Sequence, residues 1–146
     1  MKAVYIEAQG GPEVLTYGDR PEPEARAGEV KVRVKATALN RLDLYTRAGG
    51  RGLDREFPPP LILGGDCAGE VAECGDGVAM LKPGDRVVVN PRISCMQCPA
   101  CMAGQDDLCR SESFLGSAVD GSYAEYVVVP AVNAHLLGNN VSFEQA

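Results

Sequence analysis

Four cysteines within the stretch CMQCPACMAGQDDLC carry the strongest chemical signal in the chain. They are Cys95, Cys98, Cys101 and Cys109, separated by two, two and seven residues. Each C-x-x-C step lets two sulfur atoms face one point from a tight turn, and a thiolate from a short loop completes a tetrahedron. Four thiolates leave no open position for water or substrate. The spacing therefore predicts a closed, structural zinc site that holds one zinc ion per chain.

Other chemistry also uses closely spaced cysteines. A disulfide framework suits a secreted chain, but no signal peptide opens this sequence. An iron–sulfur cluster takes four cysteines, and a lone C-x-x-C can be a redox motif. Zinc is favoured because it is the usual occupant of a tetrahedral thiolate site. The lobe has few large apolar residues, so we expect the metal to supply on the order of 10 kcal/mol of folding energy.

Composition limits the kinds of partner that the chain can take. Its 146 residues are enough for one domain with its own core, and 45% of them are hydrophobic. A net charge of -6 without a Lys/Arg cluster argues against nucleic acid and anionic membranes as partners. No apolar run is long enough to span a bilayer. Six cysteines without an export signal predict a cytoplasmic location.

Alternation of apolar and polar residues predicts a mainly β chain with short helices. The clearest strand is 29–40 (EVKVRVKATALN), in which valine and alanine alternate with lysine and arginine. A short helix is expected over 41–49, and loops over 51–60 and at the start of 61–75. Further strands are expected within 2–7, 14–19, the later part of 61–75, 82–90, 120–130 and 131–138. Short strands punctuated by glycine and proline predict a barrel-like body.

The last residues carry a helix-start signal. Ser142 is followed three residues later by Gln145, which is the spacing of a capping box. The chain stops at Ala146, and so short a helix is not stable alone. We therefore expect the sequence to be a piece of a longer protein, divided at a domain boundary.

Several stretches of the chain resemble one known family. They are GGPEVL (10–15), ALNRLDLYTRAG (38–49), LGGDCAGEV (63–71), KPGDRVV (82–88), GSYAEYVVVP (121–130) and the four-cysteine lobe. Together they are similar to the N-terminal, GroES-like catalytic domain of the medium-chain dehydrogenase/reductase family, which contains zinc alcohol dehydrogenases and quinone (enone) oxidoreductases. The resemblance implies a partly open β-barrel over 1–146 with a zinc lobe at about 91–113.

The same resemblance implies a second domain of the Rossmann type that binds NAD(H) or NADP(H). That domain is absent from this sequence, because no G-x-G-x-x-G follows a predicted strand. The nicotinamide cofactor would therefore be held outside this chain, and we expect the chain alone to be inactive. Family members often form homo-oligomers through the second domain, which we expect of the full-length protein.

Two departures from the family pattern bear on its chemistry. In the zinc-using members a cysteine stands at the slot of Asn40, and a His-Glu pair stands at Gly65 and Asp66. Glycine offers no ligand atom and a neutral amide is a weak ligand, so we expect no catalytic zinc here. The N-x-x-D-x-Y pattern of the zinc-independent reductases is matched instead by Asn40, Asp43 and Tyr45.

The resemblance assigns roles to the residues of this pattern. The Asn40 amide and the Tyr45 hydroxyl can donate hydrogen bonds to an oxygen that gains negative charge as hydride arrives. Arg41 occupies a slot that some members use against the cofactor pyrophosphate, which suits a guanidinium. Structural roles stay open for each residue. Asn40 can cap the helix, Tyr45 can pack, Arg41 can be a solvated charge, and Asp43 can point inward or pair with a cation.

Three functions follow from these observations. The leading one is the substrate-side domain of an NAD(P)H-dependent oxidoreductase, quinone- or enone-reductase-like, acting on a small carbonyl, enone or quinone. The second is a zinc alcohol dehydrogenase whose catalytic site has moved to Cys67 together with Asp66 or Asp43. The third is a non-enzymatic, zinc-stapled scaffold or binding module. Cys74 and His135 are expected to be structural.

Overall fold

The computed structural model describes residues 1–49 and 59–146. All but the last two residues of the predicted loop 51–60 lie outside the described residues. The strands are β1 (Lys2–Ile6), β2 (Thr16–Asp19), β3 (Glu29–Thr37), β4 (Leu61–Ile62), β5 (Cys67–Cys74), β6 (Arg86–Val89), β7 (Arg92–Ile93), β8 (Ser113–Phe114), β9 (Tyr126–Pro130) and β10 (Ala134–Leu136). The helices are α1 (Arg41–Ala48) and α2 (Pro99–Met102), with 3-10 turns η1 (Pro12–Val14), η2 (Asp106–Leu108) and η3 (Ala131–Asn133).

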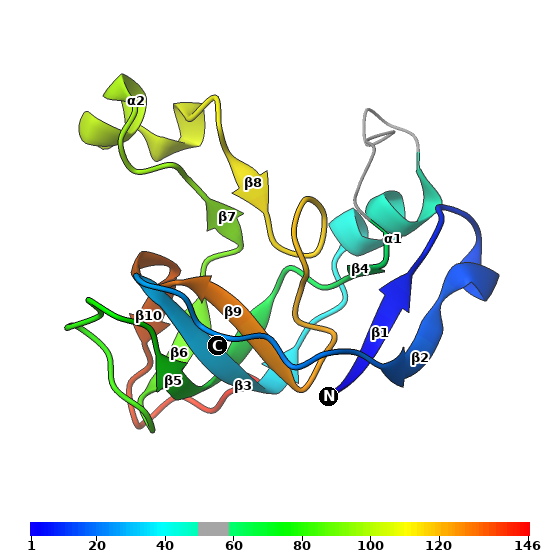
Figure 1. Cartoon of the computed structure of the whole chain (residues 1–146), viewed down its shortest axis with the longest axis horizontal. Helices are drawn as coiled ribbons and strands as arrows, with labels where there is room; N and C mark the ends of the chain where they lie inside the picture. Colours follow the sequence, from blue (N-terminus) through cyan, green and yellow to red (C-terminus); the bar gives the residue numbers. More distant parts are fainter. Residues whose placement is uncertain (50–58) are drawn as a thin grey trace.

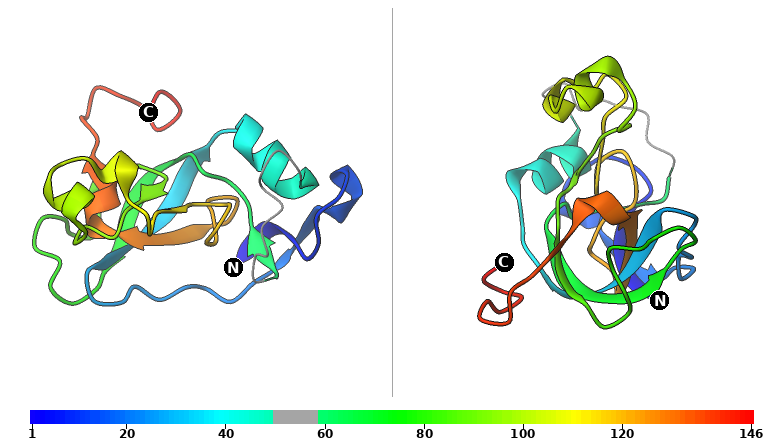
Figure 2. Two further views of the ribbon diagram at one scale, coloured as in Figure 1. Left: turned by 90° about the horizontal axis from the view of Figure 1, so that it is seen from above. Right: turned by 90° about the vertical axis from the view of Figure 1, so that its left-hand side faces the viewer.

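An antiparallel five-stranded sheet in the order β10-β6-β5-β3-β9 forms the body of the domain. It curls into half a barrel, which the right-hand view of Figure 2 shows end on. The main core lies inside this curl and is built from alternate residues of β3, β5, β6 and β9. The predicted mainly β, barrel-like fold is confirmed.

Strand β3 follows the sequence pattern in its first half and departs from it in the second. Val30 and Val32 are fully buried, whereas Val34 and Ala36 are only half-buried. The pairing of β3 with β5 shifts register twice, at Lys31/Val32 and at Val34/Ala36. Such bulges bend a strand. The end of β3 stays paired with β5 as far as Thr37, but it leaves the core and leads to α1.

A second, three-stranded sheet has the order β2-β1-β4 and lies beside α1, at the right of Figure 1. Its small core contains Ile6, Leu61 and Leu63. Residues 61 and 62 were expected in a loop, but they pair with Tyr5 and Ile6 as β4. A strand of only two residues is too short to show an alternation of apolar and polar residues, so the sequence pattern does not predict it. Likewise, η3 takes up residues 131–133 of the strand expected over 131–138.

The cysteine lobe projects from the body, at the upper left of Figure 1. The two-stranded sheet β7-β8 forms its base, through the pairs Arg92–Phe114 and Ile93–Ser113. Arg92 also pairs with Glu112, with 3.0 Å between Nη1 and Oε2. Helix α2 and turn η2 contact each other in the outer part of the lobe. The lobe limits of about 91–113 stay a prediction.

The final turn of the chain forms the predicted capping box. The Ser142 N–H donates to Gln145 Oε1 at 2.9 Å, and the Gln145 N–H donates to Ser142 Oγ at 3.3 Å. The guanidinium of Arg86 holds the preceding segment by donating to the carbonyls of Gly138 (3.1 Å) and Val141 (2.7 Å). The predicted capping-box hydrogen bonds at Ser142 are therefore observed, whereas residues 143–145 form a turn and not a helix.

Close backbone packing joins the segment after β4 to the segment before β9. The N–H groups of Gly121, Ser122 and Tyr123 donate to the carbonyls of residues 62, 64 and 63 at 2.8–2.9 Å. Gly64 has a φ of +99°, and a Cβ added there would lie 2.4 Å from the Tyr123 ring. Only glycine fits at this position, because the backbone is left-handed and the ring leaves no room.

Replacing Gly64 with alanine should therefore destabilise the domain by about 3 kcal/mol, through the strain of a positive φ and the clash with Tyr123. Gly65→Ala is the matched control, because a Cβ there meets its nearest neighbours at 3.5–3.7 Å. We expect Gly65→Ala to change stability by less than about 1 kcal/mol. Denaturant unfolding measures both, and equal destabilisation by the two variants would contradict this packing.

Candidate metal centre and candidate active-site residues

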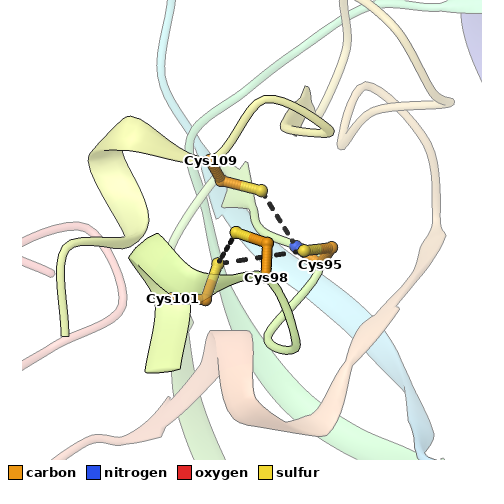
Figure 3. A group of neighbouring side chains, drawn as sticks. All are labelled: Cys95, Cys98, Cys101 and Cys109. Carbon is orange, nitrogen blue, oxygen red and sulfur yellow. Dashed lines mark hydrogen bonds between the residues drawn. The ribbon is translucent and has the colours of Figure 1, made fainter. Parts of the chain in front are cut away.

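The four cysteine sulfurs of the lobe converge on one point. Figure 3 shows Cys95, Cys98 and Cys101 meeting Cys109, which comes from the end of η2. The one candidate ligand atom of each residue lies within 4.8 Å of the other three. The sulfur of Cys101 is 3.5 Å from that of Cys98 and 3.9 Å from that of Cys95. All of the cysteines are free thiols, so no disulfide connects them.

Local sequence explains why the thiols face inward. Met96 takes a left-handed φ of 57°, which turns the chain sharply after Cys95. Pro99 stands at the first position of α2, where its fixed φ suits a helix start. Backbone N–H groups of Gln97 and Cys98 point at the Cys95 sulfur and lower the pKa of that thiol to about 6. Burial, followed by hydrogen bonds to neighbouring thiols, raises the pKa of Cys101 to about 12.

This geometry fits zinc. Bonds of about 2.3 Å from zinc to sulfur place the sulfurs of a regular tetrahedron about 3.8 Å apart. The two measured separations, 3.5 and 3.9 Å, lie on either side of that value. A cation at the centre would also keep all four thiols deprotonated. Cys95, Cys98, Cys101 and Cys109 would thus hold the metal, and all four ligand positions would be filled.

The predicted residue Asn40 caps α1. Its Oδ1 accepts a hydrogen bond from the Leu42 N–H at 3.2 Å, and its own N–H donates to Asp43 Oδ2 at 2.7 Å. The Asn40 side chain also faces the Asp43 backbone N–H, so Asn40 and Asp43 form a capping box and the capping interpretation of Asn40 is confirmed. Capping engages the Asn40 oxygen and leaves the side-chain nitrogen available. Its Nδ2 also donates to Asp66 Oδ2 at 3.2 Å, which brings together two slots of the family pattern.

Asp43 points inward and has only 4% of its surface exposed. Its Oδ2 accepts hydrogen bonds from the Asn40 N–H and, at 2.8 Å, from the hydroxyl of Tyr123. Of the two structural roles open to Asp43, the inward-pointing one is therefore observed. The ion pairs of the described residues include none to Asp43.

The backbone of Asp66 is held by two hydroxyl groups. Thr37 Oγ1 and Ser122 Oγ donate to its carbonyl at 2.7 and 2.8 Å, and they lie 2.8 Å from each other. Ser122 and Tyr123 belong to the site through these contacts, although neither was predicted from the sequence. The motif GSY at 121–123 was the available signal, since glycine there allows close approach of the two segments.

The other two predicted residues, Arg41 and Tyr45, lie on α1 after Asn40. Arg41 is exposed in the first turn of α1, and Tyr45 is half-buried further along that helix. Two cavities of about 370 and 590 Å³ share Thr37 and Ala38 in their walls. Among the described residues, neither cavity is lined by Asn40, Arg41 or Tyr45.

A displaced metal site at Cys67 finds no support in residues 1–49 and 59–146. Within them, the tetrad is the one group of three or more His, Cys, Asp or Glu side chains that could hold a metal. Cys67 is buried on β5, and burial raises the pKa of its thiol to about 12.

Comparison with known proteins identifies the family. The sequence model of the alcohol dehydrogenase GroES-like domain matches residues 26–139. The chain belongs to this family. The crystal structure of an NAD-dependent alcohol dehydrogenase shares 46% identity with this GroES-like domain, with a TM-score of 0.91 over 98% of this chain and 41% of its own. The resemblance to medium-chain dehydrogenases and reductases is therefore confirmed.

Two further relatives show the range of the family. The L-threonine 3-dehydrogenase of Francisella tularensis is 37% identical over 90% of this chain and 37% of its own length. The cobalt- and zinc-bound thermostable alcohol dehydrogenase of Pyrobaculum aerophilum is 37% identical, with a TM-score of 0.85 over 93% of this chain and 40% of its own. This GroES-like domain thus spans well under half the length of these relatives. No helix in the described residues is long and apolar enough to cross a membrane.

Removal of the metal should destabilise the lobe, because few apolar side chains hold it together. We expect about one zinc per chain by elemental analysis, and a Tm at least about 5 °C lower after chelation under reducing conditions. Cys101→Ser should weaken zinc binding at least about 100-fold. The control is Cys74→Ser, which lies outside the tetrad and should keep its zinc. An unchanged Tm after complete zinc removal would contradict a structural role.

Proposed function

We propose that the chain is the substrate-side domain of an NAD(P)-dependent oxidoreductase that binds one structural zinc and has no catalytic zinc. Its family contains alcohol and threonine dehydrogenases, which supports the reaction class. A Rossmann domain beyond 1–146 would hold the nicotinamide and deliver hydride to a small carbonyl, enone or quinone. NADH and NADPH are equally compatible with this domain, because their selector residues would lie in the second one.

The contact between Asn40 and Asp66, with Gly65 beside it, is the observation that carries this proposal. The family resemblance puts zinc ligands at Asn40 and at Gly65. Here the Asn40 oxygen is engaged by the Leu42 N–H, which leaves that atom poorly placed for a metal. Gly65 has no side chain, although a Cβ there would meet only ordinary contacts with Phe114 and Pro91. Space for a ligand exists at residue 65, but the ligand is missing.

The Asn40 amide can take over part of the role of a metal. Its nitrogen has two protons, and one of them points to Asp66. The other is left to donate to a substrate oxygen that gains negative charge during hydride transfer. Because Asn40 is exposed at the start of α1, a ligand can reach it. Capping fixes the side chain, so the donor is held in position before the substrate arrives.

Tyr45 and Arg41 complete the proposed site in the full-length protein. The Tyr45 hydroxyl would be a second donor to the substrate oxygen, and the exposed guanidinium of Arg41 would meet the cofactor pyrophosphate. Asp43 would act by holding Asn40, which is a positioning role. A homo-oligomer in the cytoplasm remains our proposal for the assembled enzyme.

A zinc alcohol dehydrogenase is the second candidate, favoured by the relative that binds both cobalt and zinc. Elemental analysis of the full-length protein separates the two candidates. We expect about one zinc per chain, together with NADH or NADPH oxidation that a panel of enones, quinones and aldehydes elicits. Two zinc ions per chain, with activity lost on removal of the weaker one, would instead establish the second candidate. Absence of nicotinamide turnover with every substrate would favour a scaffold.

Substitution of Asn40 tests the proposed donor. Asn40→Ser keeps a side-chain oxygen that can cap α1 but does not present the amide protons. We expect it to lower kcat of the full-length enzyme about 100-fold, as the loss of one donor to a developing oxyanion does elsewhere. Thermal unfolding serves as the control and should change little. Unaltered turnover in Asn40→Ser would remove Asn40 from the mechanism.

The Tyr45 hydroxyl has its own test. Tyr45→Phe keeps the ring and removes only the donor, so a packing role predicts normal turnover. If the hydroxyl supports the substrate oxygen, kcat should fall at least about tenfold with little change in KM. The measurement is steady-state kinetics with the best substrate of the panel, and an unchanged kcat would leave Tyr45 a packing residue.

A further inference from the structure

A chain of hydrogen bonds links Tyr123 to the start of α1. The Tyr123 hydroxyl lies 2.8 Å from Asp43 Oδ2, and the same oxygen accepts the Asn40 N–H at 2.7 Å. These residues come from distant parts of the sequence, because Tyr123 precedes β9 whereas Asn40 follows β3. The contact therefore depends on the close packing at Gly64, whose added Cβ would strike the Tyr123 ring.

The hydroxyl of Tyr123 acts as a donor in this chain. It has one proton and two acceptors in reach, Asp43 Oδ2 and the Ala38 carbonyl at 3.1 Å. The carboxylate is nearer and charged, so it is the stronger acceptor. Burial, and after it the neighbouring Asp43, raise the pKa of Tyr123 above its ordinary value. The hydroxyl accordingly keeps its proton at neutral pH.

Asp43 needs this donor. A carboxylate with 4% exposure is costly to bury unless hydrogen bonds compensate for its lost hydration. The Asn40 N–H alone supplies one bond to Oδ2, and the Tyr123 hydroxyl supplies the second. Without the second bond the carboxylate would turn toward water, and the first turn of α1 would lose the oxygen that holds the Asn40 backbone.

We infer that Tyr123 is a positioning residue for the reaction, because it fixes Asp43 and thereby the Asn40 amide. The neighbouring Ser122 acts in parallel on the other partner of the Asn40 contact, since it holds the Asp66 carbonyl. The segment 121–123 thus sets both sides of the Asn40–Asp66 pair. This inference rests on the proposed role of Asn40 as the donor to the substrate oxygen.

The test is Tyr123→Phe in the full-length enzyme, with Tyr126→Phe as the matched control. Tyr126 also uses its hydroxyl, as the acceptor of the Arg33 Nε–H at 3.2 Å, and it lies on β9 opposite Arg33 of β3. Tyr123→Phe should lower kcat about tenfold and leave KM within about twofold. Hydrogen exchange should become faster in peptides that cover 38–44. The control should change neither quantity.

Each other outcome overturns the inference. Unchanged kcat means that the hydroxyl does not serve the reaction, and lower kcat without faster exchange at 38–44 means that it does not act through Asn40. If Tyr123→Phe does not fold, Asp43→Asn weakens the same two bonds by removing the charge and must then show the same pattern. Asn40→Ser separates the two proposals. Normal turnover in Asn40→Ser would contradict the donor role of Asn40. Hydrogen exchange at 38–44 in Tyr123→Phe tests the Tyr123 contact independently of that result.

Discussion

The carbonyl of Asp66 is held by two hydroxyl groups, and much of the domain depends on that arrangement. Thr37 ends β3, Ser122 precedes β9, and Asp66 leads into β5. Three segments therefore meet at one backbone oxygen where the curled sheet opens toward α1. Ser122 is 1% exposed, so its bonds form away from competing water. The position of the Asn40–Asp66 pair follows from this junction rather than from the loops around it.

The lobe and the body are stabilised by different physical effects. Alternate valines of β3, β6 and β9 remove apolar surface from water in the body, which is the ordinary source of stability for a sheet. The lobe instead exposes Met96, Met102 and Leu108, and it gathers four thiols. Metal coordination can replace a hydrophobic core in so small a unit. The lobe can thus project from the sheet without a core of its own.

Elements that carry a local sequence pattern were predictable, and elements that depend on distant contacts were not. The β3 alternation, the α1 cap at Asn40 and the four-cysteine spacing are local signals, and each predicted its element. The pairing of Leu61–Ile62 with β1 and the role of Tyr123 depend on residues far apart in the sequence. Contacts of that kind arise from tertiary packing, and no local pattern in a single sequence reveals them. The roles of Tyr45 and Arg41 depend on a second domain and stay predictions.

Under the proposal that this domain has no catalytic zinc, the same contacts account for an intact architecture around the start of α1. Removing an imidazole at residue 65 would leave nearby acids unpaired unless other donors served them. Here the Asp43 carboxylate is satisfied by Tyr123 and the Asn40 backbone, and the Asp66 carboxylate by the Asn40 amide. Within residues 1–49 and 59–146, every donor in this set is neutral. A metal-free donor at Asn40 and an intact fold are therefore mutually consistent.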